Sequence, residues 1–177
     1  MGAVTTLVLA GLHPELPRAI LLVDPPDWWM PEKQATPMDA ERQKMIVQWM
    51  TDLQSKSRKQ IIAGQRKAAP RWSEAELEPW ADSKLRFHPQ VLRIFGPNPA
   101  AGVDWKSLLA KITCPVLLIT ADPALGSIVS AESAKALQAL LPQVKLAHLP
   151  GAGHNIRREQ FEPYLAAVRT FLAELPG

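Results

Sequence analysis

The sequence predicts an α/β fold of about three parallel strands with flanking helices, and three observations support this prediction. Three continuous apolar runs are each closed by turn-forming residues: Ala19–Val23, Cys114–Thr120 and Val144–Leu149. Runs of this kind are typical of strands buried on both faces of a parallel sheet. Helical patterns alternate with these runs in the outer parts of the chain, as in right-handed strand–helix–strand units. The middle of the chain has no convincing strand.

Apolar spacing and capping residues indicate the outer helices. Residues 2–14 show apolar side chains at helical spacing and end near Pro14, which predicts a buried helix. Ser130 is placed to cap a helix over Ala131–Leu141. A last helix is predicted over Glu159–Leu175, where apolar residues recur mostly three and four positions apart. These are Phe161, Leu165, Val168, Phe171, Leu172 and Leu175.

The middle of the chain is helical by pattern. Thr36-Pro37 predicts one helix start, Ser73 with Glu76 predicts a capping box at another, and Pro89–Phe95 predicts a short helix. One apolar stripe is expected to face a core: Met45, Ile46, Trp49, Met50 and Leu53. We therefore divide the chain into a core, residues 1–27 and 105–177, and a helical cap, residues 28–104. The alternative is ordinary crossover helices, although one crossover rarely needs this many residues.

Composition argues against several classes of partner. Among 177 residues, 20 lysines and arginines stand against 17 acidic residues. The denser basic stretch between Lys56 and Arg71 has no interleaved aromatic residues, so we interpret it as solvated surface and expect no nucleic-acid binding. The apolar run Ala3–Leu12 is too short to span a bilayer and no basic region precedes it, so no membrane association is expected.

The cysteine and histidine content bounds the chemistry further. A single cysteine, Cys114, rules out an internal disulfide framework and fits a reducing compartment, so a cytoplasmic protein is expected. The four histidines and the cysteine show no ligand spacing. Neither a metal nor another cofactor is therefore expected.

The strongest functional signal is His154, which follows the third predicted strand in the turn Pro150-Gly151-Ala152-Gly153-His154. Sites in parallel sheets are built at the carboxyl ends of the strands, and the glycines permit backbone conformations that aim the imidazole over the sheet. An amphipathic helix follows directly. We therefore predict a catalytic role for His154 and surface or capping roles for the other histidines.

In these features the chain resembles the α/β-hydrolase family. Leu149–Ile156 is similar to that family's histidine turn, Glu159–Leu172 to its closing helix, and Cys114–Ile119 to its penultimate strand. The segment 1–18 is similar to the end of a nucleophile elbow and the helix that follows it. The resemblance implies a serine-type hydrolase that acts on an ester or related acyl substrate, with His154 as general base and then acid.

The same resemblance implies that the attacking serine lies outside this chain. The elbow of the family is Gly-x-Ser-x-Gly. If Gly2 is its last glycine, the serine stands immediately before Met1, and the backbone N–H of Met1 is an oxyanion donor in the full enzyme. We therefore expect an amino-terminally truncated fragment that is inactive alone.

Two aspartates are candidates for the acid that orients His154. The family pattern after the penultimate strand places an aspartate at the position of Ala124, which cannot serve. Asp122 lies two residues earlier, and Asp24 ends the first predicted strand, where some members of the family place this acid. An aspartate before proline is also a common turn residue, so both assignments stay open.

The tryptophans also permit two interpretations. Trp28 and Trp29 follow the first strand, where they would line an apolar acyl pocket in one interpretation and simply pack the cap onto the sheet in the other.

Two further functional hypotheses compete with the hydrolase. In one, the chain is a non-catalytic module or subunit that pairs with a separate amino-terminal chain. This hypothesis rests on the predicted strand Ala19–Val23, whose unpaired apolar edge favours pairing or self-association through the sheet. In the other, the chain is a small complete domain that binds a ligand at its strand ends.

Overall fold

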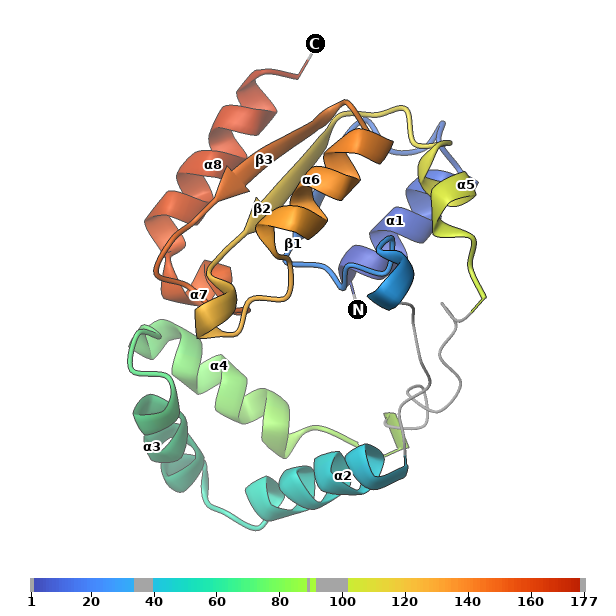
Figure 1. Ribbon diagram of the computed structural model, residues 1–177. Helices are drawn as coiled ribbons and strands as arrows, with labels where there is room; N and C mark the ends of the chain where they lie inside the picture. The colour runs from blue at the N-terminus through green and yellow to red at the C-terminus, as the bar shows by residue number, and fades with distance from the viewer. Residues whose placement is uncertain (1, 34–39, 89, 92–101, 176–177) are drawn as a thin grey trace. The chain divides into compact units, whose positions relative to one another are not determined.

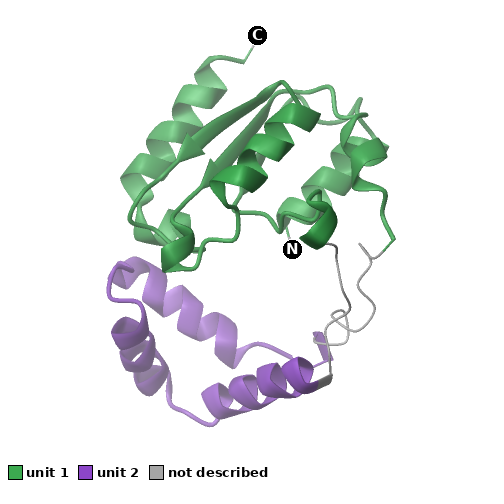
Figure 2. Ribbon diagram, viewed as in Figure 1, with its two compact units in different colours: residues 1–34, 102–177 green, residues 35–101 purple. Residues whose placement is uncertain are grey.

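The chain forms two compact units, which divide it differently from the predicted core and cap. The computed structural model describes residues 2–33, 40–88, 90–91 and 102–175. Unit 1 comprises residues 1–34 and 102–177, and unit 2 comprises residues 35–101 (Figure 2). Trp28 and Trp29, which the prediction assigns to the cap, belong to unit 1. The Trp29 indole N–H donates to the Ser133 carbonyl at 2.9 Å, and the rings of Trp28 and Trp105 lie 5.9 Å apart.

Unit 1 is built on a parallel sheet, which confirms the predicted fold class. Its described strands are β1 (Ile20–Val23), β2 (Val116–Thr120) and β3 (Val144–His148), in the order β1–β2–β3 (Figure 1). Every residue of β2 is buried, because β2 lies between the other two strands. The prediction of burial on both faces is wrong for β3, an edge strand in which Leu146 is 42% exposed.

Helices cover both faces of the sheet (Figure 1). α8 (Phe161–Ala173) packs on one face, where Phe171 and Val168 contact the side chains of Leu117 and Ile119. On the other face, α1 (Gly2–Leu12) contacts β1 and α6 (Ala131–Leu140) contacts β3. Unit 1 also contains α5 (Trp105–Leu109), α7 (Ile156–Glu159) and two short 3₁₀ turns, η1 (Pro31–Lys33) and η3 (Pro123–Leu125).

The closing helix differs from its prediction. The helix predicted over Glu159–Leu175 is α8, and a separate short helix, α7, precedes it, because Gln160 leaves helical geometry (φ −138°, ψ 58°) between the two. Phe161 and Leu172 of the predicted apolar stripe are about half exposed, so α8 is buried along a narrower face than expected.

Two of the predicted helix starts are described by the structure, and one has the predicted cap. The Ser130 side chain accepts the Ser133 N–H at the start of α6, which confirms that cap. A helix does begin after Ser73, as α4, but the capping box predicted there is wrong, because the Ser73 side chain makes no capping hydrogen bond. The described capping box is at α3, where Ser57 and Gln60 bond reciprocally.

Unit 2 contains the helices α2 (Ala40–Gln54), α3 (Arg58–Ala68) and α4 (Glu74–Leu85). Its core forms around Leu53, Ile61 and Ala81. The apolar stripe predicted for α2 is only partly buried: Met50 is buried, whereas Met45 is 65% exposed and Trp49 48% exposed. Lys84 lies over the Trp49 ring at 5.7 Å. The role of this unit as a cap stays a prediction.

The remaining helix signals, Thr36-Pro37 and most of Pro89–Phe95, lie outside the described residues. No helix in the described part of the chain is long and apolar enough to cross a membrane.

The sheet register provides a matched test of the core. Leu118 and Leu146 are partners on adjacent strands, but Leu118 is fully buried and Leu146 is largely exposed. We expect Leu118→Ala to lower the free energy of unfolding by about 2–5 kcal/mol, because it removes buried apolar atoms and leaves a cavity. Leu146→Ala, the control, should cost less than about 1 kcal/mol. Urea denaturation of both variants measures the difference, and equal losses would contradict the assignment of β2 to the centre of the core.

Candidate active site

The site lies where the three strands end. Because the strands are parallel, the segments that follow Val23, Thr120 and His148 emerge at the same edge of the sheet. These segments carry Asp24, Asp122 and His154, the residues that the sequence analysis selected. β2 is central, so its loop runs between the segment of Asp24 and the segment of His154.

Asp24 is the most constrained of these residues. Its side chain is completely buried, and its carboxylate accepts four donors. The backbone N–H groups of Ile128 and Val129 donate at 2.9 Å, and the Ser127 hydroxyl donates at 2.7 Å. The fourth donor is His154 Nδ1, at 2.7 Å from Oδ2.

The backbone of Asp24 is also unusual. Its φ of +43° makes it the one non-glycine residue with positive φ among those that the structure describes. This conformation costs on the order of 1 kcal/mol or more and persists only where surrounding contacts enforce it. Here the Asp24 N–H continues the sheet by donating to the Ile119 carbonyl at 2.9 Å, and the carboxylate is held by its four donors. The strained residue is therefore fixed at both its backbone and its side chain.

The turn before His154 depends on its glycines. Gly151 adopts a left-handed conformation with φ of +81°. Gly153 is needed for a different reason: a Cβ atom there would lie far inside van der Waals contact of the Leu125 carbonyl oxygen, which is backbone and cannot move aside. The Gly153 N–H donates to Glu159 of α7 at 2.8 Å. His154 therefore leaves a turn whose path is set by contacts on two sides.

Electrostatics favour a charged pair between Asp24 and His154. Burial raises the pKa of the Asp24 carboxyl, but the hydrogen bonds from His154, Val129 and Ser127 outweigh burial, so this pKa lies below its ordinary 3.8. The hydrogen bond to Asp24 raises the pKa of His154 above 6.5, against the opposing effect of burial. An ionised carboxylate only accepts, so Nδ1 carries the proton and Nε2 of neutral His154 is an acceptor. About half of the His154 side chain is exposed.

Asp122, the other candidate acid, contacts the histidine turn instead of the imidazole. Its Oδ2 accepts the Gly151 N–H at 2.7 Å, and its Oδ1 lies 3.2 Å from His148 Nε2. Asp24 is thus the aspartate that the structure brings to His154. His148, predicted to be a surface residue, is partly exposed, and its other ring nitrogen lies 3.1 Å from the Thr120 hydroxyl.

The other predicted site residues make no described contact with Asp24 or His154. Trp29 is buried and its indole N–H is bound to Ser133, and Trp28 packs on Trp105, so the contacts of both tryptophans lie within unit 1. A role for either tryptophan in a substrate pocket stays a prediction. Met1 lies outside the described residues.

Two contributors were missed by the sequence analysis. Ser127 was not predicted as a site residue, and Glu159 was predicted only as the start of a helix. No local pattern marks either one, because each acts on a residue distant in sequence or across a turn.

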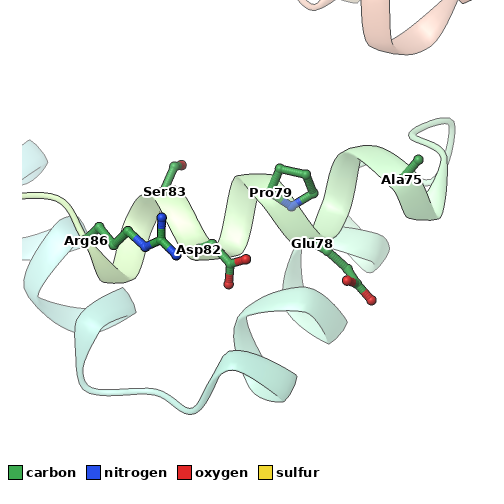
Figure 3. Close-up of a pocket in the computed structure, with 6 residues that line it drawn as sticks. All are labelled: Ala75, Glu78, Pro79, Asp82, Ser83 and Arg86. Atoms are coloured by element: carbon green, nitrogen blue, oxygen red, sulfur yellow. The ribbon is translucent and has the colours of Figure 1, made fainter.

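A hollow elsewhere in the chain is separate from this chemistry. It measures about 420 Å³ and lies in unit 2 along one side of α4 (Figure 3). It is lined by Ala75, Glu78, Pro79, Asp82, Ser83 and Arg86. Its two acidic residues are bound to Arg58 of α3, and it contains none of the strand-end residues, so we assign it no catalytic role. Among the described residues, no group of three or more potential ligands is placed to hold a metal ion.

The solved structures that are similar to this chain in fold include α/β-hydrolases. The chain is similar to an N-formylmaleamic acid deformylase from Pseudomonas putida, with a TM-score of 0.65, 19% identity, and coverage of 94% of this chain and 62% of that chain. For a hydrolase from Oleispira antarctica the TM-score is 0.61, the identity 17%, and the coverage 98% and 62%. For a carboxylesterase from Bacillus subtilis the TM-score is 0.59 and the identity 15%, with coverage of 97% of this chain and 56% of that chain.

These likenesses establish the fold. The chain has a partial α/β-hydrolase fold, its carboxy-terminal portion, and spans about three fifths of the length of these structures. No protein-family model and no curated protein matches the sequence. At these identities the likeness is one of fold, and the chemistry is argued from the strand-end residues.

The close approach at Gly153 yields a mutational prediction. Gly153→Ala should lower the free energy of unfolding by on the order of 2 kcal/mol, because the new methyl group displaces the turn from the Leu125 carbonyl. Gly2→Ala in α1 is the control, since nothing lies within 4 Å of its added Cβ and alanine favours a helix. Thermal unfolding of both variants measures the effect. A Gly153→Ala protein as stable as the Gly2→Ala protein would show that the turn is not confined.

The Asp24–His154 pair also predicts a pH dependence of stability. Asp24 has a lowered pKa, so its contribution is present above pH 3.8 and is lost as pH falls through its pKa in the folded protein. His154 has a raised pKa, so its contribution is complete below pH 6.5 and is lost as pH rises through its pKa in the folded protein. The pair should therefore stabilise most between these values.

Urea denaturation of the wild type and of His154→Gln tests this expectation. The difference in free energy of unfolding between the two proteins should be larger at about pH 5.5 than at about pH 9. A His13→Gln variant, altered at an exposed histidine, controls for the general effect of losing an imidazole. A difference that stays constant over this range would refute the charged pair.

Proposed function

We propose that His154 and Asp24 are the base and the orienting acid of a hydrolase that acts on an ester or a related acyl compound. The observation that carries this proposal is the 2.7 Å contact between His154 Nδ1 and a completely buried Asp24 carboxylate. This contact fixes the tautomer and leaves Nε2, which has no hydrogen-bond partner among the described residues, as the proton acceptor. A base held in this way is suited to acyl transfer.

The reaction follows from these roles. Nε2 takes the proton of an attacking hydroxyl while its oxygen bonds to the carbonyl carbon, and Asp24 stabilises the imidazolium that forms. The imidazolium then gives that proton to the leaving group as its bond to the carbonyl carbon breaks. Water repeats the sequence on the acyl intermediate, which releases the acid and restores the enzyme. The raised pKa of His154 favours the protonated form that the second step requires.

We further propose that the nucleophile comes from outside the described residues. Within the described part of the chain, no serine hydroxyl or cysteine thiol is bonded to His154. The solved structures that the chain matches are longer by about two fifths of their own length. A serine elbow that precedes residue 1 would supply the hydroxyl, and the 177-residue chain alone would then be inactive.

The substrate class rests on the chemistry of the pair and on the relatives. Names among the matched structures include a deformylase, a carboxylesterase and a thioesterase domain, all of which describe acyl transfer to water. We propose a small-molecule acyl compound on this basis.

An ester-hydrolysis assay tests the proposal. The coding sequence ahead of the Met1 codon is read first for an in-frame Gly-x-Ser. p-Nitrophenyl esters are then offered to the 177-residue chain and to a chain that includes the upstream segment. We expect turnover only from the longer chain, and we expect His154→Ala to reduce kcat by on the order of 10⁴–10⁶-fold. Asp24→Asn should reduce it by about 10⁴-fold, because the histidine tautomer is no longer fixed.

His13→Gln is the matched control and should stay within about twofold of the wild type, because His13 is exposed and is bound only by a surface contact with Glu15. Turnover by the 177-residue chain that His154→Ala abolishes would contradict the external nucleophile but keep the base. Turnover by the longer chain that His154→Ala leaves intact would overturn the proposed function.

A second candidate, a module that pairs with a separate chain, is favoured by the exposed apolar surface next to β1. α1 has no charged residue and its only polar side chains are those of Thr5 and Thr6, yet Leu9 is 44% exposed and Leu12 58% exposed. β1 stands at one edge of the described sheet. On this proposal the chain self-associates or binds a strand-bearing partner through that edge. Sedimentation of a monomer over a wide concentration range would argue against self-association.

A further inference from the structure

The loop that follows β2 contacts both partners of the His154–Asp24 pair. Its first part, residues 122–126, meets the histidine turn, and its second part, residues 127–129, binds the Asp24 carboxylate. This placement follows from the strand order, because β2 lies between the strand that leads to Asp24 and the strand that leads to His154.

Asp122 binds the histidine turn through both its side chain and its backbone. Its carboxylate accepts the Gly151 N–H at 2.7 Å, and its own N–H donates to the Ala152 carbonyl at 3.0 Å. Two consecutive residues of the turn are thereby bound to one residue of the loop. The next residue of the turn, Gly153, lies against the Leu125 carbonyl.

The same residue also organises its own loop. The Asp122 carbonyl accepts the N–H groups of Leu125 and Ser127, at 2.9 and 3.3 Å, which closes the loop on itself. Ser127 in turn donates its hydroxyl to Asp24 at 2.7 Å. A continuous set of hydrogen bonds thus runs from the histidine turn through Asp122 to the carboxylate that His154 contacts.

We propose that Asp122 is a positioning residue for His154: by holding the Gly151–Gly153 turn against the β2 loop, it sets the distance between the imidazole and Asp24. The proposal rests on the proposed function, since that distance matters for acyl transfer. It assigns to Asp122 a role other than that of the orienting acid, because its carboxylate binds a backbone N–H of the turn and reaches the reaction only through His154.

A histidine titration tests this inference without any substrate. The pKa of His154 is measured from its Cε1 proton by NMR, with His154→Gln used to assign the signal among the four histidines. In Asp122→Ala the turn loses its acceptor, the contact with Asp24 lengthens, and the pKa of His154 falls toward 6.5. Asp122→Asn should retain most of the raised value, because its amide oxygen still accepts the Gly151 N–H.

A control separates this effect from the neighbouring ion pair. His148→Gln removes the contact between His148 and Asp122 and should leave the pKa of His154 at its wild-type value. If Asp122→Ala does not melt cooperatively, Asp122→Ser provides the same comparison, with exchange of the Gly151 amide hydrogen as a second measure of the lost bond.

Two results would overturn the inference. One is a folded Asp122→Ala protein in which His154 keeps its wild-type pKa. The other is an Asp122→Asn protein that loses as much of the raised pKa as Asp122→Ala does, which would attribute the effect to charge instead of position. Because no hydrolysis is measured, these outcomes stand apart from the ester assay: the expected titration together with turnover by the longer chain that His154→Ala leaves intact would refute only the proposed function.

Discussion

A charged carboxylate with no exposure to water, that of Asp24, is the constraint on which the rest of unit 1 depends. An uncompensated charge of this kind costs several kcal/mol, so its donors are obligatory parts of the fold. They come from the turn after β3 and from the loop after β2, which are distant from Asp24 in sequence. The buried carboxylate therefore requires the strand order, the β2 loop and the histidine turn at the same time. Loss of the donors from any one of them would leave the charge of Asp24 incompletely compensated.

The fold was predictable from the sequence because its signals are local. The apolar run that becomes β2 is buried on both faces as expected, whereas β1 is fully buried on one face only. The Gly-rich segment before His154 forms the expected turn at the strand ends. His154 itself was selected from the same local pattern. The errors lie where a neighbour decides burial: Leu146 was expected inside and is exposed, since β3 is an edge strand.

The aspartate that contacts His154, and the groups that bind this aspartate, were not predictable to the same degree. Asp24 and Asp122 each follow a strand and precede proline, so sequence offers no criterion between them. The choice is made by a left-handed backbone at Asp24 and by donors more than one hundred residues away in sequence. In the same way, the need for glycine at position 153 arises from a backbone oxygen of another loop.

Because Gly153 lies against the Leu125 carbonyl, the length of the loop after β2 and the length of the turn after β3 cannot change independently. A residue inserted between Asp122 and Ser127 would move that carbonyl, and Gly153 has no side chain that could adjust to the change. Loop exchange between this protein and its structural relatives should therefore succeed only when both segments are transferred as a pair. The smallest segment that can be exchanged therefore comprises both the β2 loop and the histidine turn.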